Sequence, residues 1–312
     1  MTENTMNQDN IIELKNLTKK FTLESGFFAR QDRFIYAVND VSLSIKRGTT
    51  YGLAGESGCG KSTTAKLIAG MYKADSGQIT FSPVSGSKDS VKYIFQDPGR
   101  SLNPRMTVYT ILTDGLKHSP RWPGKEQARK MAGKILQEVG LSEEDLDRRP
   151  SEFSGGQRQR ISIARGLLTQ PELLICDEVV SALDVSIQGQ ILNLLQDIKK
   201  SRGLSYLFIA HDLRVCCYFC DRIGIMYRGV LVEEADAADL YKTALHPYTQ
   251  LLFKGATGST DVSQGEVKTA LTTLKGCPFA HRCPKAGEQC FEQLPEWKEE
   301  KGHKVRCFNL NN

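Results

Sequence analysis

The chain has 312 residues, enough for one large domain or for a domain with an appendage. Hydrophobic residues make up 40% and charged residues 25%, and the formal net charge of +5 comes from scattered basic residues, which does not favour nucleic acid as a partner. No run approaches the roughly 18 to 20 apolar residues of a membrane span, and the polar N-terminal segment lacks the apolar region of a signal peptide. We therefore expect a cytosolic protein whose membrane role, if it has one, comes through partners.

The first part of the chain alternates between strand and helix patterns. Alternating apolar residues predict strands at residues 11–21 and 37–48, with an aromatic hairpin or exposed loop between them. A short apolar strand at residues 51–55 precedes a glycine-rich turn and a helix at residues 63–72. Another strand is predicted at residues 91–97.

Residues 101–153 then show the apolar spacing of three and four that is typical of helices. Beyond them, strands at residues 172–178 and 205–212 flank a helix at 186–200, as in a parallel α/β sheet. A pair of short strands follows. From about residue 245 the apolar rhythm weakens, and residues 255–267 predict a linker before a small tail that contains Cys and Pro.

The glycine-rich turn matches the phosphate-binding pattern G-x-x-x-x-G-K-[ST] and lies between a strand and a helix, as that loop requires. Its backbone N–H groups and the N-terminus of the helix would hold the phosphates of ATP. Lys61 would reach the β- and γ-phosphates, and the Ser62 hydroxyl would ligate Mg²⁺. The predicted nucleotide-binding residues of this loop are Gly55, Ser57, Gly58, Cys59, Gly60, Lys61, Ser62 and Thr63.

A second acidic motif ends the predicted strand at residues 172–178. Its position suits Asp177 for the Mg²⁺ shell, and Glu178, one residue further, for orienting or deprotonating the attacking water. Two acids after an apolar run are also common as solvated charges at a strand end. The surrounding motifs therefore decide between the two interpretations.

Directly before a helix and upstream of the two acids stand Ser154, Gly155, Gly156 and Gln157. These four residues resemble the signature sequence of the ABC ATPase family. Asp184 resembles the aspartate of its D-loop, His211 its switch histidine and Gln96 its Q-loop glutamine. All of these motifs occur in the family order, so the resemblance covers residues 11 to about 235.

The resemblance implies a P-loop NTPase of the α/β class. Its parts would be an N-terminal antiparallel β subdomain, a parallel core sheet, an α-helical subdomain and a small Cys-rich C-terminal extension. We expect the ATPase domain at residues 11–245, with the helical subdomain and its signature motif at about 97–165. The linker and the extension would occupy residues 246–312.

The resemblance also implies a mechanism. Two subunits would pair head to tail, so that Ser154 and Gly156 of one chain contact ATP bound to the other. Water would attack in line, with Glu178 as the base and with Lys61, Mg²⁺ and His211 stabilising phosphate charge. Gln96 is expected both in catalysis and at the Mg²⁺ ion.

One aromatic residue of the family stacks on adenine shortly after the first strand. Phe21 holds that place, Tyr36 is a second candidate, and Phe27 and Phe28 are weaker ones. Packing in the core is an equal alternative for Phe21.

The chain departs from the family pattern at Val179, where a proline usually follows the catalytic glutamate. Proline there would only fix φ, so we expect the chemistry to survive in a looser loop. A run of cysteines, Cys216, Cys217 and Cys220, is interpreted as packing of small buried residues rather than as a metal site.

Further residues resemble the ATPases of oligopeptide and dipeptide (peptide/nickel) importers, of the DppF/OppF type. They are Gln96-Asp97-Pro98, the segment SLNPRMT at residues 101–107 and the segment HPYTQLL at 246–252. This resemblance implies a second homologous ATPase subunit, two transmembrane permeases and, indirectly, an extracytoplasmic substrate-binding protein as partners. The chain would lie at the cytoplasmic face of the bacterial membrane. Branch members serve peptides, nickel or other chelated metals, and some sugars, and the sequence does not choose among them.

Three other functions are alternatives to transport. Soluble ABC ATPases of ribosome recycling, DNA repair or translation control usually carry two ATPase units or long coiled-coil insertions, which this sequence lacks. An ATPase attached to a soluble enzyme complex, as in phosphonate breakdown, is a closer alternative. A purely structural binding module is disfavoured because Lys61, Asp177, Glu178 and His211 are intact.

The tail contains four cysteines spaced C-x5-C-x6-C-x16-C, the first two followed by proline: Cys277, Cys283, Cys290 and Cys307. Four thiolates suit a four-iron four-sulfur cluster or a tetrahedral zinc ion. The spacing is typical of neither a zinc site nor a ferredoxin, so the residues leave both open, together with four reduced thiols. The resemblance to the extension of peptide-importer ATPases, some of which bind iron–sulfur, implies a 4Fe-4S cluster with zinc as the alternative. A structural role is expected, because so small a segment buries little apolar surface.

Overall fold

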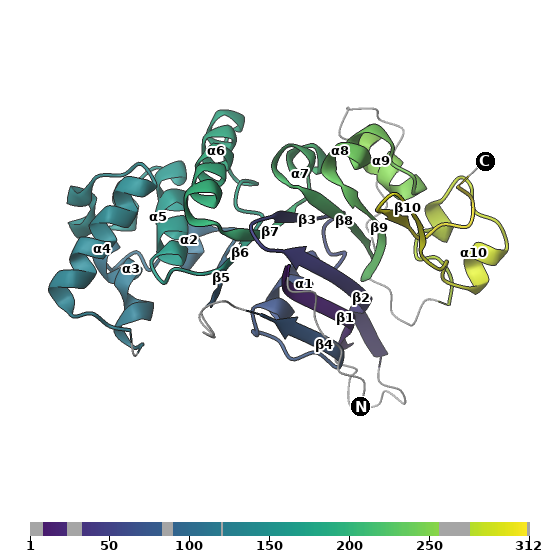
Figure 1. The fold of residues 1–312 in the computed structure, drawn as a ribbon, viewed down its shortest axis with the longest axis horizontal. Helices are drawn as coiled ribbons and strands as arrows, with labels where there is room; N and C mark the ends of the chain where they lie inside the picture. Colours follow the sequence, from purple (N-terminus) through teal and green to yellow (C-terminus); the bar gives the residue numbers. More distant parts are fainter. Residues whose placement is uncertain (1–8, 24–32, 83–89, 120, 256–274, 311–312) are drawn as a thin grey trace. The chain divides into compact units, whose positions relative to one another are not determined.

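The structure is a computed structural model that describes residues 9–23, 33–82, 90–119, 121–255 and 275–310. Figure 1 shows the order of its helices and strands. The chain forms two compact units, one of residues 1–82 and 207–312 and the other of residues 83–206. The boundary falls within strand β7 (Ser205–Ala210). The predicted domain bounds stay predictions. Phe27, Phe28 and most of the predicted linker lie outside the described residues.

The first unit contains a three-stranded antiparallel sheet. Strand β1 (Asn10–Leu23) pairs on one side with β2 (Arg33–Lys46) and on the other with β4 (Ser76–Phe81). Apolar residues of β1 such as Leu14 and Leu17 are buried. The predicted N-terminal antiparallel subdomain is confirmed, and register irregularities interrupt the regular alternation along β1.

A second sheet of this unit has the strand order β10-β11-β9-β8-β3. Strand β3 (Thr50–Ala54), buried at every residue, runs parallel to β8 (Arg222–Tyr227), and β8 runs antiparallel to β9 (Val230–Asp236). The last two strands, β10 (Lys298–Glu300) and β11 (His303–Val305), form an antiparallel hairpin that pairs with β9. The sheet is mixed because β9 runs antiparallel to β8, and the C-terminal extension adds two further strands that the sequence did not predict.

The helices of the first unit are α1 (Lys61–Ile68), α7 (Leu213–Phe219), α8 (Ala237–Lys242), α9 (Pro247–Gly255), the 3₁₀ turn η4 (Ala280–Arg282) and α10 (Gln289–Glu292). Cys216 and Cys220 are buried, as expected for residues that pack in the interior. Partial burial raises the pKa of Cys217 to about 12. The Cys217 thiol is therefore protonated at neutral pH.

The second unit joins two parallel strands, β5 (Val91–Ile94) and β6 (Leu173–Asp177), to a group of helices. These are α2 (Pro98–Ser101), α3 (Val108–Lys117), α4 (Lys125–Glu138), η2 (Glu143–Asp147), η3 (Pro150–Glu152), α5 (Gly155–Leu167) and α6 (Val185–Arg202). Helices α3, α4 and α5 pack on one another around buried apolar residues such as Leu112, Ile135 and Ile161. The helical pattern predicted for residues 101–153 is confirmed.

Among the described residues, no helix combines the length and the apolar character that crossing a bilayer requires.

Candidate nucleotide-binding site

The phosphate-binding loop begins where β3 ends and is shaped by glycines with positive φ. Gly55, Gly58 and Gly60 have φ of 149°, 77° and 111°. A Cβ atom at Gly55 would lie 2.2 Å from the Met226 carbonyl oxygen, and one at Gly60 would lie 2.0 Å from that of Ala37. Both the conformation and the close approach of backbone therefore require glycine at these two places. Ser57 and Gly58 are exposed between them.

Lys61 is the first residue of α1 and is buried. Its Nζ atom donates hydrogen bonds to the carbonyl oxygens of Gly55, at 2.7 Å, and Glu56, at 3.0 Å. Gly60 at the N-cap position has no side chain to bond the first N–H groups of the helix, and a helix N-terminus of this kind binds phosphate. The cationic Nζ and the turn fit the phosphate chain of ATP. Ser62 and Thr63 are half-buried on the first turn of the helix.

Two contacts from the C-terminal part of the chain hold the loop residue Glu56. Its N–H donates to the Tyr248 hydroxyl at 2.8 Å, and its carboxylate accepts two hydrogen bonds from Arg282, at 2.9 and 3.0 Å. The hydrogen bond with Glu56 raises the pKa of Arg282, and burial raises that of Tyr248. The sequence pattern missed these residues, because Glu56 fills a variable position of the motif and no local signal links it to Tyr248 or Arg282.

The acidic pair of the second unit is delivered by β6, which is buried throughout. The Tyr93 hydroxyl donates a hydrogen bond to the Asp177 carboxylate. Glu178 adopts a φ of 50°, a left-handed conformation that is unusual outside glycine and costs about 1 to 3 kcal/mol. Its carboxylate accepts a hydrogen bond of 2.7 Å from the Gln96 side-chain amide. The structure thus brings together Gln96 and Glu178, which the sequence predicted as separate site residues, at a point of backbone strain.

The signature residues begin helix α5 at the surface of the second unit. Ser154 and Gln157 cap the helix reciprocally, because the Gln157 N–H donates to the Ser154 hydroxyl at 3.3 Å and the Ser154 N–H to the Gln157 side chain at 2.9 Å. Ser154, Gly155 and Gln157 are exposed, whereas a Cβ at Gly156 would lie 2.8 Å from an Ile187 methyl carbon. The N-terminus of this helix is therefore accessible from outside.

Two further predicted residues, Asp184 and His211, are exposed. Asp184 is the N-cap residue of α6, and His211 directly follows β7, two positions before α7. Phe21 is 37% exposed and packs edge-on against Tyr72, with ring centroids 5.6 Å apart. Tyr36 is half-buried on β2. Which ring stacks on adenine stays a prediction.

The predicted site residues are divided between the two units. The phosphate loop, Phe21 and His211 belong to the first unit, whereas Gln96, Asp177, Glu178, the signature residues and Asp184 belong to the second.

Comparisons with known proteins show the family to which the chain belongs. The profile described as "ABC transporter" matches residues 38–181, and the profile "Oligopeptide/dipeptide transporter, C-terminal region" matches residues 232–290. The chain is 42% identical to the oligopeptide transport ATP-binding protein AppF of Bacillus subtilis, over 96% of this chain and 98% of that protein. It is 38% identical to the oligopeptide transport ATP-binding protein OppF of Escherichia coli, over 96% of each. The chain belongs to the oligopeptide/dipeptide ABC transporter ATPases.

Solved structures confirm the P-loop ABC ATPase fold. One is cbiO1 of Clostridium perfringens, part of the transporter complex cbiONQ, with a TM-score of 0.63 and 25% identity over 75% of this chain and 92% of that one. Another is the ATP-binding cassette MJ0796, described as a dimeric post-hydrolysis state bound to ADP and Pi. Its TM-score is 0.61 and its identity 28%, over 72% of this chain and 98% of that one. An antiparallel β subdomain, a mixed sheet and helices are what these ABC transporter ATPases share with the chain.

The C-terminal extension of this ATPase gathers its four cysteines around one small cavity of about 10 Å³, room for about one water molecule: Cys277, Cys283, Cys290 and Cys307. The Cys277 N–H donates to the Cys290 carbonyl oxygen at 2.7 Å. Burial raises the pKa of Cys277 to about 11, and it also raises the pKa values of Cys283 and Cys307. Across the described part of the chain, no three or more Cys, His, Asp or Glu residues are arranged as a ready metal site. The four sulfur atoms therefore line one cavity.

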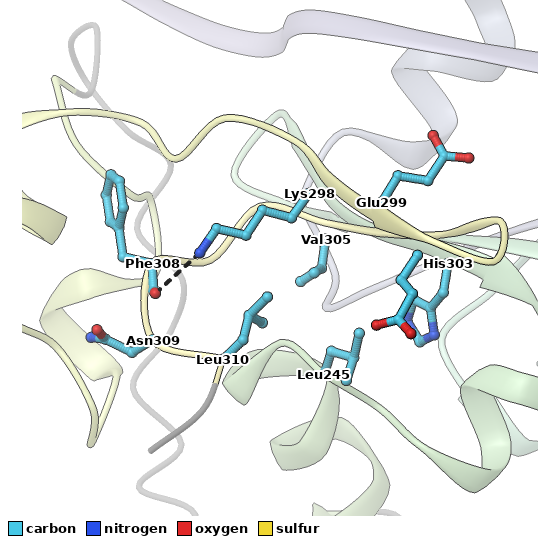
Figure 2. A pocket seen from close by; sticks show the side chains of 9 residues that line it. Leu245, Lys298, Glu299, His303, Val305, Phe308, Asn309 and Leu310 are labelled. Atoms are coloured by element: carbon cyan, nitrogen blue, oxygen red, sulfur yellow. Dashed lines mark hydrogen bonds between the residues drawn. The ribbon is translucent and has the colours of Figure 1, made fainter.

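Figure 2 shows a larger cavity of about 380 Å³ beside the β10–β11 hairpin, lined by residues such as Lys298, Val305 and Leu245. His303 Nε2 lies 2.7 Å from the carboxylate of Glu233 on β9, and the Leu245 N–H donates to that same carboxylate at 2.7 Å. Lys298 donates to the Phe308 carbonyl oxygen at 3.3 Å. None of the predicted site residues lines this cavity. The His303–Glu233 contact joins the extension to strand β9.

Proposed function

We propose that this ATPase powers the import of dipeptides or oligopeptides. It would lie at the cytoplasmic face of the bacterial membrane and act with a second homologous ATPase and two transmembrane permeases. An extracytoplasmic substrate-binding protein would deliver the substrate to the permeases. The observation that carries this proposal is the match of the peptide-transporter C-terminal profile to residues 232–290, together with relatives named for oligopeptide transport along nearly the whole chain.

The proposed chemistry begins with the phosphate loop. Lys61 would leave its two carbonyl partners for the β- and γ-phosphates, and Ser62 and Asp177 would hold Mg²⁺. Glu178 would act as the base toward water. The contact between Gln96 and Glu178 supports this role, because the amide donor orients the carboxylate. The carbonyl oxygen of the same amide is the atom that would serve Mg²⁺.

The proposed head-to-tail pair rests on the accessibility of the signature helix. Ser154 and Gly155 are exposed at its N-terminus, where an anion on another chain can approach. Val185, directly after Asp184, is 84% exposed, which suits a residue that is covered in an assembly. The similar cassette MJ0796 is described as a dimer.

Co-purification and transport assays test this function. The tagged chain, expressed with its natural genomic neighbours, should retain a second ATPase and two multispanning permeases. Proteoliposomes containing that complex should take up labelled peptide when ATP is enclosed on the ATPase side. Recovery of a soluble enzyme complex in place of permeases, or uptake of nickel or sugar but not of peptide, contradicts the proposal.

For the extension we propose a thiolate metal centre on Cys277, Cys283, Cys290 and Cys307: a 4Fe-4S cluster, with zinc as the alternative. The shared cavity supports one common centre. Protein purified without oxygen should be brown, with broad absorbance near about 400 nm, as iron–sulfur clusters show. Stoichiometric zinc without iron would establish the alternative, and absence of both metals would refute a metal centre.

A further inference from the structure

We propose that Arg282 of the C-terminal extension is a positioning residue of the ATP site, acting through Glu56 of the phosphate loop. Arg282 cancels the charge of the Glu56 carboxylate and, together with Tyr248, fixes that residue in place. The extension is then a part of the nucleotide site rather than an independent tail. The inference rests on the proposed binding of ATP by residues 55–63, and neither on the transported substrate nor on a metal.

The contact itself is a two-point ion pair. Arg282 Nη1 lies 2.9 Å from Glu56 Oε2, and Nη2 lies 3.0 Å from Oε1. This paired geometry is the strongest form of an arginine–carboxylate contact. The two side chains are 21% and 25% exposed, so water screens the pair less than one on the open surface. The Tyr248 hydroxyl holds the main chain of the same loop residue, because it accepts the Glu56 N–H.

A buried aromatic cluster of Tyr227, Tyr248 and Phe279 holds Arg282 close to Glu56. The Tyr227 ring centroid lies 4.5 Å from that of Tyr248, and the Phe279 centroid lies 5.4 Å from both. Phe279 is the N-cap residue of the turn η4, which contains Arg282, and the Arg282 guanidinium carbon lies 5.9 Å from the ring centroids of Tyr227 and Phe279. Arg282 is therefore held by a part of the extension that packs tightly against the first unit.

The charge of Glu56 explains why this pairing matters for ATP. A carboxylate in the loop that receives a triphosphate repels it, and the repulsion is larger in a partly buried site than in water. Paired with a guanidinium, the carboxylate adds no net charge. The Glu56 carbonyl oxygen also accepts a hydrogen bond from Lys61 Nζ, so a shift of Glu56 disturbs a partner of the phosphate-binding lysine.

The test is the affinity of the full chain for Mg·ATP, measured by calorimetric titration. For Arg282→Gln we expect affinity about 10-fold weaker, the loss that about 1.4 kcal/mol of unfavourable interaction produces. The deficit should shrink at high salt, because salt screens charge repulsion. Arg282→Lys keeps the charge without the two-point geometry and should fall in between. The double variant Glu56→Gln/Arg282→Gln removes both charges, and its affinity should return to within about 3-fold of the parent.

Lys304→Gln is the matched control. Lys304 is a cation on β11 of the same extension, and its Nζ pairs with Glu299 at 3.7 Å. Its substitution should leave the affinity unchanged. An unchanged affinity of Arg282→Gln overturns the proposal, and so does a double variant as weak as the single one, because loss of packing alone would not be rescued by removal of Glu56. A melting curve for each variant shows whether it is folded. If Arg282→Gln is unfolded, the Mg·ATP affinity of Arg282→Lys decides the question. If Lys61→Ala binds ATP normally, the assigned ATP site is wrong, whatever Arg282 does.

Discussion

The substitution Phe279→Ala tests how strongly one buried aromatic side chain holds the C-terminal extension to the rest of the first unit. Phe279 is 1% exposed and packs against Tyr227 and Tyr248. Replacing a buried phenylalanine by alanine costs about 3 to 5 kcal/mol, including the loss of its aromatic contacts. The other buried apolar side chains of residues 275–310 are those of Pro278, Ala280, Cys290, Pro295, Val305 and Cys307. Because these bury little area, we expect the extension to detach while the rest of the unit stays folded.

Hydrogen exchange read by mass spectrometry measures this directly. In Phe279→Ala, residues 275–310 should exchange at least about 100-fold faster, the change that about 3 kcal/mol of lost local stability produces. Strands β3 and β8 should keep their protection. Phe291→Ala is the matched control, since Phe291 lies in the same extension but is 46% exposed, and its ring meets His281 at 5.1 Å. Unchanged protection of the extension in Phe279→Ala, or an equal effect of Phe291→Ala, refutes the reasoning.

Three other predictions follow from the site and from burial. Glu178→Gln should bind Mg·ATP but hydrolyse it about 10²- to 10⁴-fold more slowly in the assembled transporter, because a general base is lost; near-normal turnover would show that Glu178 is not the base. The isolated chain should be a poor ATPase whose turnover rises when its partner ATPase and permeases are added, and full activity of a demonstrated monomer would rule out the shared site. Burial lowers the pKa of His246 to about 4, so the unfolded chain binds more protons than the folded one between about pH 4 and 6.5. His246 should therefore lower the stability as the pH falls through that window, and urea unfolding of His246→Gln should show a flatter pH dependence there; an unchanged slope contradicts it.

The sequence alone determined the phosphate loop, because that loop is local. Gly55 and Gly60 adopt positive φ within one short turn, and the strand before and the helix after are contiguous with it. Backbone conformation and residue type are linked over a few residues, so the pattern predicts the structure directly. The same holds for the signature helix, whose cap joins Ser154 to Gln157, three residues away.

The tertiary structure decided which distant residues meet. The bond between Gln96 and Glu178 depends on the parallel pairing of β5 with β6, which brings the ends of these two distant strands side by side. Arg282 and Glu56 are 226 positions apart, and no pattern within either segment refers to the other. Their meeting is set by the packing of Phe279 and by the pairing of β11 with β9, both of which depend on side-chain burial across the whole unit rather than on local propensity.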